Sequence, residues 1–488
     1  MNLAPVNLNS SLNLHQHIGA FKPDADIFGQ PASAWLNSVA QLNAQLVKHP
    51  QKKWLLFDES AANFSVMFFA LLTSQKQIVL PPSDRPNQLL ALKPHVDATL
   101  GSASIDGLPH LSGDPIDQGT AQNTNIQSNP APLIIMPEQT IEFFTSGSTS
   151  EAKKISKSWS LLNNEINALD ALWSESLANA QVVSTVSHQH IYGLIFTVLW
   201  PVLAGRQIHQ QFIRFPEELN LLLSQQLKPI TLISSPAFLT RTCNEPLYQN
   251  HTSRFNSVYS SGGPLPLDTA LAIQQQLGHS PIEVFGSTET GGIAWRRQTD
   301  RLTATLWQPF ADIHIRATAE QRLEIQSPYL PQELPQERPQ ELPQQLSQQG
   351  AQKDWYTTDD RVIISPQGLF ELLRRADRIV KIEQKRLSLD TLEATLSEHP
   401  WVQQCRSLVV SGKREQIAVA VVLTEQGQSH YQQHNKRHIN QQLRQHLANH
   451  FEAVLLPRKW RYVSTLPVNS QGKVVHQDLM RLFEGSTE

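Results

Sequence analysis

The sequence has little charge and almost no cysteine. Lys, Arg, Asp and Glu together account for 17% of the 488 residues, and the formal net charge is −3. Because there is no excess of Lys and Arg to neutralise phosphates, a protein whose main partner is nucleic acid is disfavoured. The two cysteines, Cys243 and Cys405, cannot form a disulfide scaffold, and their spacing fits no metal motif. We therefore expect a reducing, cytoplasmic environment.

Long apolar runs are also missing. Residues 1–19 are polar and lack the cationic start and apolar block of a signal peptide. The longest apolar run, residues 191–205, contains Pro201 and is shorter than the roughly 20 residues that a membrane-spanning helix needs. We expect this run to form a buried helix or a pair of strands, and we expect no membrane span.

Short apolar runs typical of strands recur through the first two thirds of the chain. Longer stretches compatible with helices, such as residues 160–178, lie between many of them. This alternation predicts an α/β fold, with a large N-terminal domain of several subdomains built on parallel sheets. The predicted strands are residues 54–57, 78–80, 133–136, 182–186, 231–233 and 282–285.

The pattern becomes smaller in scale near the C-terminus. Residues 361–373 predict a hairpin, residues 374–400 a charged turn followed by a helix, and residues 417–423 a strand. One face of an amphipathic helix is indicated by apolar residues that recur every four positions, namely Ile439, Leu443, Leu447 and Phe451. We expect a compact α+β domain over residues 377–488 and a larger domain over residues 1–376.

A proline-rich segment interrupts the larger domain. Proline occupies positions 331, 335, 339 and 343, and prolines at this spacing remove helix hydrogen bonds turn after turn. We interpret residues 331–350 as an extended, solvated insert without a catalytic role.

One stretch is unusually rich in hydroxyl groups. Residues 143–154, FFTSGSTSEAKK, combine five Ser and Thr residues with one Gly and two Lys directly after an apolar run. Backbone N–H groups, hydroxyls and lysine in a loop of small residues suit a phosphate, although a solvated linker has the same composition. The sequence Gly-Lys-Ser/Thr does not occur, which disfavours a P-loop NTPase.

The same stretch resembles the phosphate loop of the adenylate-forming superfamily, which includes acyl-CoA synthetases, peptide-synthetase adenylation domains and luciferases. Four further motifs resemble those of the family and follow in the family's order: 285-FGSTE-289, 355-WYTTDD-360, 375-RADRIVK-381 and 467-PVNSQGK-473. The resemblance covers nearly the whole chain, although residues 1–130 match only in general pattern. Other residues replace family glycines or a proline at Ser150, Ala152, Lys154, Asp359, Arg374 and Gln384.

The resemblance implies two successive reactions. A carboxylic acid attacks the α-phosphorus of ATP and gives an acyl-adenylate and pyrophosphate. A phosphopantetheine thiol, from CoA or a holo acyl carrier protein, then accepts the acyl group. The first step needs in-line positioning and stabilisation of charge on phosphate oxygens, so ATP, Mg²⁺ and the thiol are the implied cofactors.

The resemblance also implies a role for individual residues. The predicted phosphate-binding set is Thr145, Ser146, Gly147, Ser148, Thr149 and Lys153. The predicted contacts to adenine, ribose and the α-phosphate are Gly262, Gly263, Phe285, Gly286, Thr288, Asp360 and Arg375. A core aromatic is the alternative for Phe285, and a plain turn is the alternative for Gly262 and Gly263.

Three residues are implied to be catalytic, and one to be a hinge. Glu289 would bind Mg²⁺, a hard cation that prefers oxygen ligands, and Thr149 would contact the phosphates. Lys473 would bridge the carboxylate and the α-phosphate, although a solvated surface lysine is the alternative. Asp377 matches the hinge about which the small, mobile domain would rotate between the two half-reactions.

The acid is predicted from residues 186–194, VSHQHIYGL, which resemble the HxxG segment of fatty-acid and aryl-acid activators. No acidic residue lies between Glu175 and Glu217, so we expect no buried counter-ion for an α-amine there. We expect an aryl acid such as a hydroxycinnamate, or a fatty acid, in a pocket formed by His190, Gly193 and Ser235. A hydrogen-bonded core histidine is the alternative for His190.

Residues 187–206 also resemble stand-alone ligases of bacterial aryl polyene and fatty-acid-like gene clusters. That resemblance implies an acyl carrier protein as the acceptor. No carrier-type serine motif follows Lys473, so we expect the carrier to act in trans. CoA stays an alternative because both acceptors present the same phosphopantetheine arm.

Two other classes of function stay open. A protein that binds nucleotide or adenylate without turnover would explain the replaced glycines, yet the residues with chemical roles are all present: Thr149, Lys153, Glu289, Asp360, Arg375 and Lys473. Oxidation of an acyl-adenylate, as in luciferases, would consume oxygen and need no thiol.

The insert gives a first testable prediction. Deletion of residues 331–349 should leave the kcat of acid-dependent pyrophosphate release unchanged, because we assign the segment no contact with substrate. Steady-state assays of the deletion variant beside the full chain would measure this. A large loss of kcat would contradict the interpretation.

Overall fold

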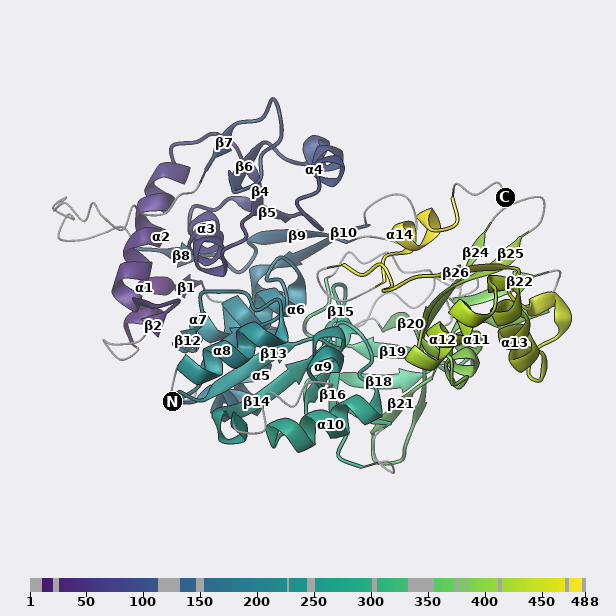
Figure 1. The fold of residues 1–488 in the computed structure, drawn as a ribbon. Coiled ribbons are helices and arrows are strands. Elements are labelled where there is room, and N and C mark those ends of the chain that lie inside the picture. Colours follow the sequence, from purple (N-terminus) through teal and green to yellow (C-terminus); the bar gives the residue numbers. More distant parts are fainter. Residues whose placement is uncertain are drawn as a thin grey trace, which may run out of the picture. The chain divides into compact units, whose positions relative to one another are not determined.

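The computed structural model divides the chain into two compact units, Met1–His314 with Gln326–Ala351, and Ile315–Ile325 with Gln352–Glu488 (Figure 1). The residues described are 11–20, 26–112, 132–145, 153–225, 228–243, 251–300, 305–331, 355–373, 378–382, 385–410, 415–469 and 474–484. The domain boundary predicted between residues 376 and 377 lies outside these ranges, as does the predicted insert beyond residue 331.

A six-stranded sheet forms the first layer of the first unit. Its strand order is β10 (Lys153–Ser158), β9 (Thr140–Thr145), β5 (Gln77–Leu80), β4 (Lys53–Phe57), β6 (Ala98–Gly101) and β7 (His110–Leu111). All neighbouring strands are parallel except β10, which pairs with β9 as a hairpin. The helix α3 (Ala61–Thr73) begins at the N-cap Ser60 and packs against β4, β5 and β6 with ten buried residues.

A second sheet lies in the same unit. Its strands within this unit follow the order β12 (Gln207–Ile208), β11 (Gln181–Ser184), β13 (Ile230–Ser234), β14 (Phe255–Ser260), β15 (Ile282–Ser287), β16 (Gly291–Arg297) and β17 (Leu306–Pro309). The strands from β12 to β15 are parallel, and β16 and β17 are antiparallel. Every residue of β13 is buried, as expected for a parallel strand covered on both faces.

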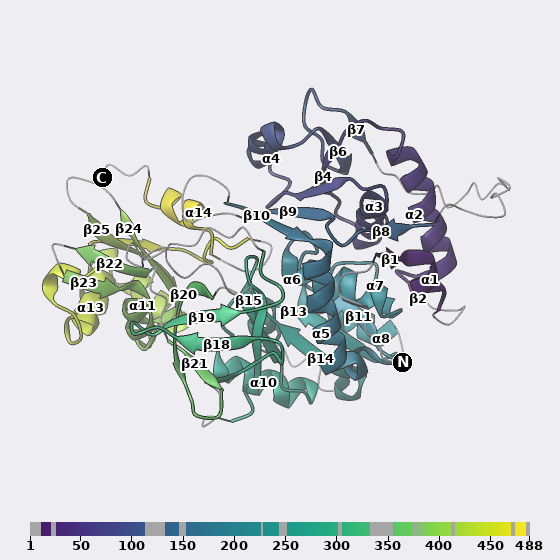
Figure 2. The same ribbon diagram turned by 180° about the vertical axis from the view of Figure 1, so that it is seen from behind.

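Helices cover this second sheet. The helix α5 packs against β14, and Figure 2 shows the two elements side by side. The helices are α5 (Trp159–Leu177), α8 (Pro216–Gln225), α9 (Pro236–Cys243) and α10 (Leu267–Leu277). One apolar core, which includes Leu232, Phe238, Val258 and Ile273, joins α8, α9 and α10 to β13 and β14.

The apolar run at residues 191–205 is helical and buried. It forms α6 (Ile191–Gly193), a π-helical turn (Leu194–Leu199) and α7 (Trp200–Leu203). The prediction of a buried helix there is confirmed. Within the described ranges, no helix is both long and apolar enough to cross a membrane.

The remaining elements of the first unit are short apart from α2. They are β1 (Leu12–Asn13), α1 (Leu14–Gly19), β2 (Asp26–Ile27), β3 (Gln30–Pro31), α2 (Ala32–Leu46), α4 (Pro86–Leu92), a 3-10 turn (Lys93–His95) and β8 (Ile134–Ile135). The helix α2 packs on α3, which places a third layer beyond the first sheet.

The second unit begins with four neighbouring strands, of which β19, β20 and β21 pair antiparallel, and continues with a small domain. The first group is β18 (His314–Ala317), β19 (Arg322–Gln326), β20 (Tyr356–Ile364) and β21 (Phe370–Leu372). β20 and β21 form the hairpin predicted for residues 361–373. A second hairpin, β22 (Ile379–Ile382) and β23 (Lys385–Ser388), occupies part of the stretch that was expected to be only a charged turn.

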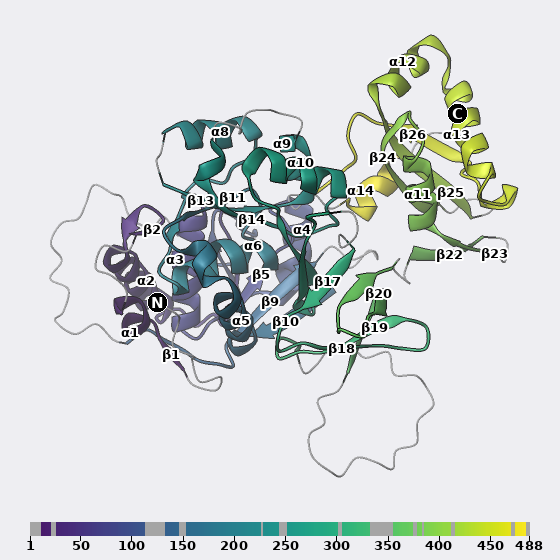
Figure 3. The same ribbon diagram turned by 90° about the horizontal axis from the view of Figure 1, so that it is seen from below.

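Among the described residues, four helices and a three-stranded sheet complete this unit, and Figure 3 shows α11 beside β24. The elements are α11 (Leu389–Ser397), β24 (Val402–Val410), β25 (Gln416–Leu423), α12 (Glu425–Gln433), α13 (Lys436–Ala448), a 3-10 turn (Ala453–Leu455), β26 (Lys459–Tyr462) and α14 (His476–Arg481). Ile439, Leu443 and Leu447 are fully buried, as predicted from their spacing. Phe451 follows the end of α13 and packs against the same core.

Candidate functional site

Many of the predicted site residues follow the carboxyl ends of neighbouring parallel strands. Ser235 follows β13, Gly262 and Gly263 follow β14, and Phe285 and Gly286 lie at the end of β15. Since β13, β14 and β15 are adjacent and parallel, these residues reach the same edge of one sheet. Open α/β sheets bind their ligands at this edge.

The segment after β11 reaches this edge through a tight turn into α6. His190 is the N-cap of α6, and its carbonyl accepts a hydrogen bond from Leu194 N at 2.7 Å. Gly193 has no room for a side chain, because a Cβ there would lie 2.1 Å from Ser187 O. The glycine of the HxxG-like segment is therefore required by a close backbone approach.

His188 has a structural role in the same turn. Its Nε2 lies 2.9 Å from the carbonyl oxygen of Asp58, at the end of β4, and its ring lies 4.7 Å from that of Phe64. Burial lowers the pKa of His188 to about 4, so the imidazole is neutral at neutral pH. The contact joins the edge of the first sheet to the edge of the second.

A buried ion pair fixes the loop that carries Gly262 and Gly263. Arg296 Nε donates to Glu283 Oε1 at 2.8 Å, across the β15–β16 pair. The other carboxylate oxygen of Glu283 accepts a hydrogen bond from Leu265 N at 3.1 Å. The loop also needs its glycine, because Gly262 has a φ of +90°.

The turn between β15 and β16 carries Thr288 and Glu289. Ser287 N donates to Thr290 Oγ1 at 3.0 Å, and Thr290 N donates to Ser287 Oγ at 3.2 Å. A Cβ on Gly286 would lie 2.1 Å from Gly291 O, so the two strands approach too closely for any side chain there. These contacts hold Glu289 at the tip of a fixed hairpin.

Phe285 presents a half-buried ring just before this turn. Its centroid lies 5.5 Å from that of Trp307 at an interplanar angle of 55°. The guanidinium of Arg296 lies 4.3 Å from the centroid of the same Trp307 ring. The Phe285 ring therefore packs in a tilted contact against an aromatic residue of β17.

Lys153 and Glu289 meet across the two sheets. Lys153 begins β10, opposite Thr145 in the β9–β10 register, and its Nζ lies 2.7 Å from Glu289 Oε1. Burial by itself would raise the pKa of Glu289, but hydrogen bonds and the charge of Lys153 lower the pKa below its ordinary value. The carboxylate is thus ionised at neutral pH and fits the oxygen ligand that Mg²⁺ prefers.

Several predicted site residues lie outside the described ranges. The roles assigned to them, and to the side chain of Thr145, stay predictions. They are Ser146, Gly147, Ser148, Thr149, Arg375, Asp377 and Lys473.

Asp360 lies in β20 of the second unit. Its backbone N donates to Thr358 Oγ1 at 3.2 Å. The neighbouring Asp359, which replaces a family glycine, accepts from Arg322 Nη2 at 3.1 Å. The replacement at position 359 thus has a local ion-pair partner on β19.

Arg378 anchors the chain just beyond the predicted hinge position. Its guanidinium contacts Asp390 at 2.9 Å and Glu393 at 2.5 Å, both on α11. Glu393 also accepts from Ser407 Oγ at 2.7 Å and from Arg406 at 3.0 Å. The segment that follows Asp377 is therefore tied to the core of the second unit.

Two buried charges near Glu289 were not found by sequence reasoning. Lys157 on β10 is 1% exposed, and Glu165 on α5 is 5% exposed. The signal for Lys157 is its position two residues after buried Ile155, on the same face of the strand. A charged residue at a core position of a strand is unusual unless it is paired.

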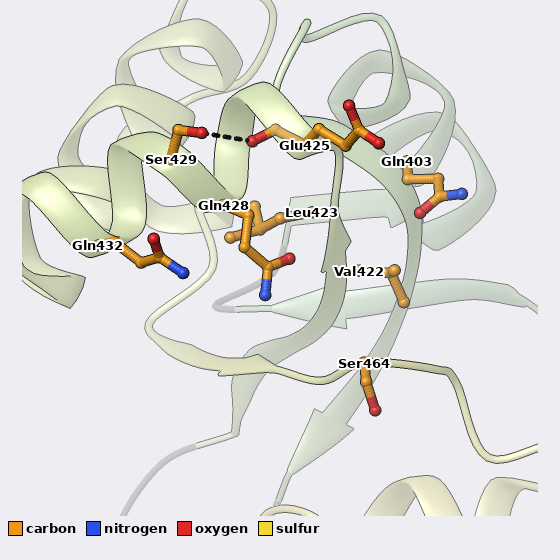
Figure 4. Close-up of a pocket in the computed structure, with 8 residues that line it drawn as sticks. All are labelled: Gln403, Val422, Leu423, Glu425, Gln428, Ser429, Gln432 and Ser464. Carbon is orange, nitrogen blue, oxygen red and sulfur yellow. Dashed lines mark hydrogen bonds between the residues drawn. The ribbon is translucent and has the colours of Figure 1, made fainter.

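A hollow of about 520 Å³ lies elsewhere, in the second unit (Figure 4). Its walls come from β24, β25, α12 and the segment after β26, and they contain none of the predicted site residues. The lining residues are Gln403, Val422, Leu423, Glu425, Gln428, Ser429, Gln432 and Ser464. Ser429 Oγ donates to Glu425 O at 3.0 Å, so this polar side chain bonds to its own helix.

Comparison with known proteins places the chain in a family. Residues 70–324 match the AMP-binding enzyme family, and residues 391–473 match the AMP-binding enzyme C-terminal domain. A probable CoA ligase of Humulus lupulus, CCL8, is 22% identical over 98% of this chain and 82% of that protein. A 4-coumarate–CoA ligase of Cereibacter sphaeroides is 23% identical over 69% of this chain and 71% of that protein.

Solved structures share the fold. The crystal structure of ATP-bound MatB from Rhodopseudomonas palustris has a TM-score of 0.75 at 16% identity, and covers 97% of this chain and 99% of that one. The α/β fold predicted from the sequence is confirmed by this likeness. Since the AMP-binding match spans more than half of the sequence, this chain belongs to the AMP-binding enzyme family, within the adenylate-forming superfamily that its motifs resemble.

Proposed function

We propose that this enzyme activates an aryl acid such as a hydroxycinnamate, or a fatty acid, and transfers it to a phosphopantetheine thiol. ATP-dependent activation of an acid to an acyl-adenylate, followed by ligation to CoA, is the general chemistry of the family. The observation that carries the catalytic part is the contact between Lys153 and Glu289. It brings the end of the phosphate-loop hairpin to the residue suited to bind Mg²⁺.

Each residue of the site would have its own role in adenylation. Lys153 would meet the phosphates that leave as pyrophosphate, and bound Mg²⁺ would neutralise charge on the phosphate oxygens. Glu289 would hold that ion. Phe285 would stack on the adenine, Asp360 would accept from the ribose hydroxyls, and Lys473 would bridge the acid and the α-phosphate.

The proposed class of acid follows from the lack of a counter-ion for an amine. The segment around His190 contains no acidic residue. Asp58 is brought to it by the fold, but contacts His188 through its carbonyl oxygen, and its Oδ1 accepts from Ser60 N at 2.9 Å. The 4-coumarate–CoA ligase relative supports an aryl acid in particular.

The acceptor is proposed to be the phosphopantetheine of an acyl carrier protein acting in trans, with CoA as the alternative. The proposal rests on the resemblance of residues 187–206 to stand-alone ligases. The two relatives described above are CoA ligases, which supports the alternative. A cytoplasmic location would give access to either acceptor.

A panel of acids tests this function. Pyrophosphate release would be followed with MgATP and hydroxycinnamic, benzoic, medium-chain and long-chain fatty acids or amino acids. Each acid would be tested with CoA, with holo carrier protein and with no thiol. We expect release with aryl or fatty acids, accelerated by carrier protein. Binding of ATP without turnover on any acid would favour a non-catalytic binding protein, and oxygen uptake would favour oxidation.

Lys473 should act only in the first half-reaction. Lys473→Ala should lower adenylation by about 10²–10³, the cost of one lost transition-state charge contact. Transfer from a supplied acyl-adenylate to the thiol should survive, because a rotated small domain would remove Lys473 from the site. Single-turnover assays of the two steps would measure this, and equal losses in both would contradict the two-conformation account.

The adjacent lysines of β10 provide a matched pair. Lys153→Met should lower kcat/KM for MgATP by about 10²–10³, since Lys153 faces Glu289. Lys154→Met should have little effect, because Lys154 points to the opposite face and lies 3.4 Å from Glu142. Steady-state kinetics over a range of MgATP concentrations would compare them, and similar losses in both variants would refute the assigned orientation.

A further inference from the structure

Two buried charges lie beneath the hairpin that carries Glu289. Glu165 is on α5 and Lys157 is on β10, and neither belongs to a motif of the family resemblance. Because both side chains are almost completely buried, neither can contact the reacting atoms directly. Their placement nevertheless connects the phosphate-loop strand with the turn at Glu289.

Glu165 contacts the backbone at the start of β16. Its Oε1 accepts a hydrogen bond from Gly292 N at 2.8 Å. A Cβ on Gly291, whose φ is +68°, would lie 2.5 Å from Glu165 Oε2 and 3.2 Å from Tyr329 Cβ. The residue two positions after Glu289 is therefore enclosed between Glu165 and Tyr329.

Lys157 closes the same cluster from β10. Its Nζ donates to Tyr329 O at 2.8 Å, and Asn164, next to Glu165 on α5, donates to Pro328 O at 3.3 Å. The two elements thus hold the 328–329 segment that encloses Gly291. Burial lowers the pKa of Lys157 to about 8, and the charges of Glu165 and Glu289 oppose this shift.

A short connection joins Lys157 to Glu165. Ser158, the residue after Lys157, is the N-cap of α5, and its Oγ accepts from Leu161 N at 3.4 Å. The strand that begins with Lys153 therefore continues without a loop into the helix that carries Glu165. β10 and the contact between Glu165 and Gly292 are therefore linked by continuous secondary structure.

The cluster also contains polar atoms that are not satisfied. Glu165 Oε2 and Tyr329 Oη are buried and have no hydrogen-bond partner among the described residues. A buried polar atom without a partner is destabilising. An apolar residue at position 165 would remove the unsatisfied Oε2, but it would leave Gly292 N without its acceptor.

We propose that Glu165, supported by Lys157, is a positioning residue for Glu289. It fixes the backbone at the start of β16, so that the Glu289 carboxylate faces Lys153 in the orientation that binds Mg²⁺. This inference rests on the proposed function, which assigns Mg²⁺ to Glu289. Supporting residues of this kind typically change metal affinity by about 10- to 100-fold when they are replaced.

The test compares Glu165→Leu and Glu165→Gln with the control Glu175→Gln, an exposed carboxylate on the same helix. The concentration of Mg²⁺ for half-maximal pyrophosphate release would be measured at fixed ATP, together with the thermal unfolding midpoint. We expect Glu165→Leu to raise this concentration by about tenfold or more. Glu165→Gln should raise it less, because an amide oxygen can still accept from Gly292 N, and Glu175→Gln should not change it.

A second readout does not need turnover. Binding of Mn²⁺ to the ATP-bound enzyme, followed by electron paramagnetic resonance without any acid, should weaken in the same order. If wild-type enzyme binds Mn²⁺ and ATP but no acid supports release, the proposed function fails while this order still tests the positioning role. An unchanged metal requirement in both Glu165 variants, with only the unfolding midpoint lowered, would overturn the inference.

Lys157→Met tests the supporting residue. Alone it should raise the metal requirement, and combined with Glu165→Leu it should add less than its separate effect, because both act on one turn. Independent effects that multiply would show that Lys157 does not act through Glu165. If Glu165→Leu does not fold, the single and double variants made with Glu165→Gln test the same coupling to Lys157.

Discussion

The contact between Lys153 and Glu289 is the interaction on which the site depends. It joins the hairpin of the first sheet to the β15–β16 turn of the second, at 2.7 Å between Nζ and Oε1. An ion pair this exposed contributes only about 0–1 kcal/mol to stability. Its importance is electrostatic, because it keeps a carboxylate ionised and places a cation where phosphate oxygens would bind. The contact thereby joins the two sheets of the first unit beside the carboxylate that we propose binds the metal.

The parallel order of the second sheet supplies the rest of the site. Adjacent parallel strands end at one edge of the sheet. Residues that are far apart in sequence, such as Ser235 and Phe285, therefore lie at the same edge. Close backbone approaches then fix the loops. Gly193 and Gly286 would each place a Cβ 2.1 Å from a carbonyl oxygen, which explains why these two motif glycines are kept although others in the chain are replaced.

Much of the fold and several site residues could be predicted from the sequence, and the physical reason differs from one element to another. Strand alternation and the four-residue spacing in α13 report burial directly, and the motif residues Lys153 and Glu289 were both expected to contact phosphate and metal. The β22–β23 hairpin was not predicted because the charged residues of that stretch indicated only a turn, and the contacts of Arg378 with Asp390 and Glu393 form only in the folded unit. Glu165 and Lys157 were missed because a single charged residue adds no periodic pattern to the sequence. Its burial depends on partners far along the chain.

The central claim is that Glu289 binds the metal of ATP while the acid is adenylated. Exchange of labelled pyrophosphate into ATP, without thiol and across a range of Mg²⁺ concentrations, tests it most directly when wild-type enzyme is compared with Glu289→Gln. The account predicts exchange that requires the acid, and a variant that loses most of the exchange and needs more Mg²⁺ for what is left. Exchange without acid, or the same Mg²⁺ dependence in both proteins, would contradict it.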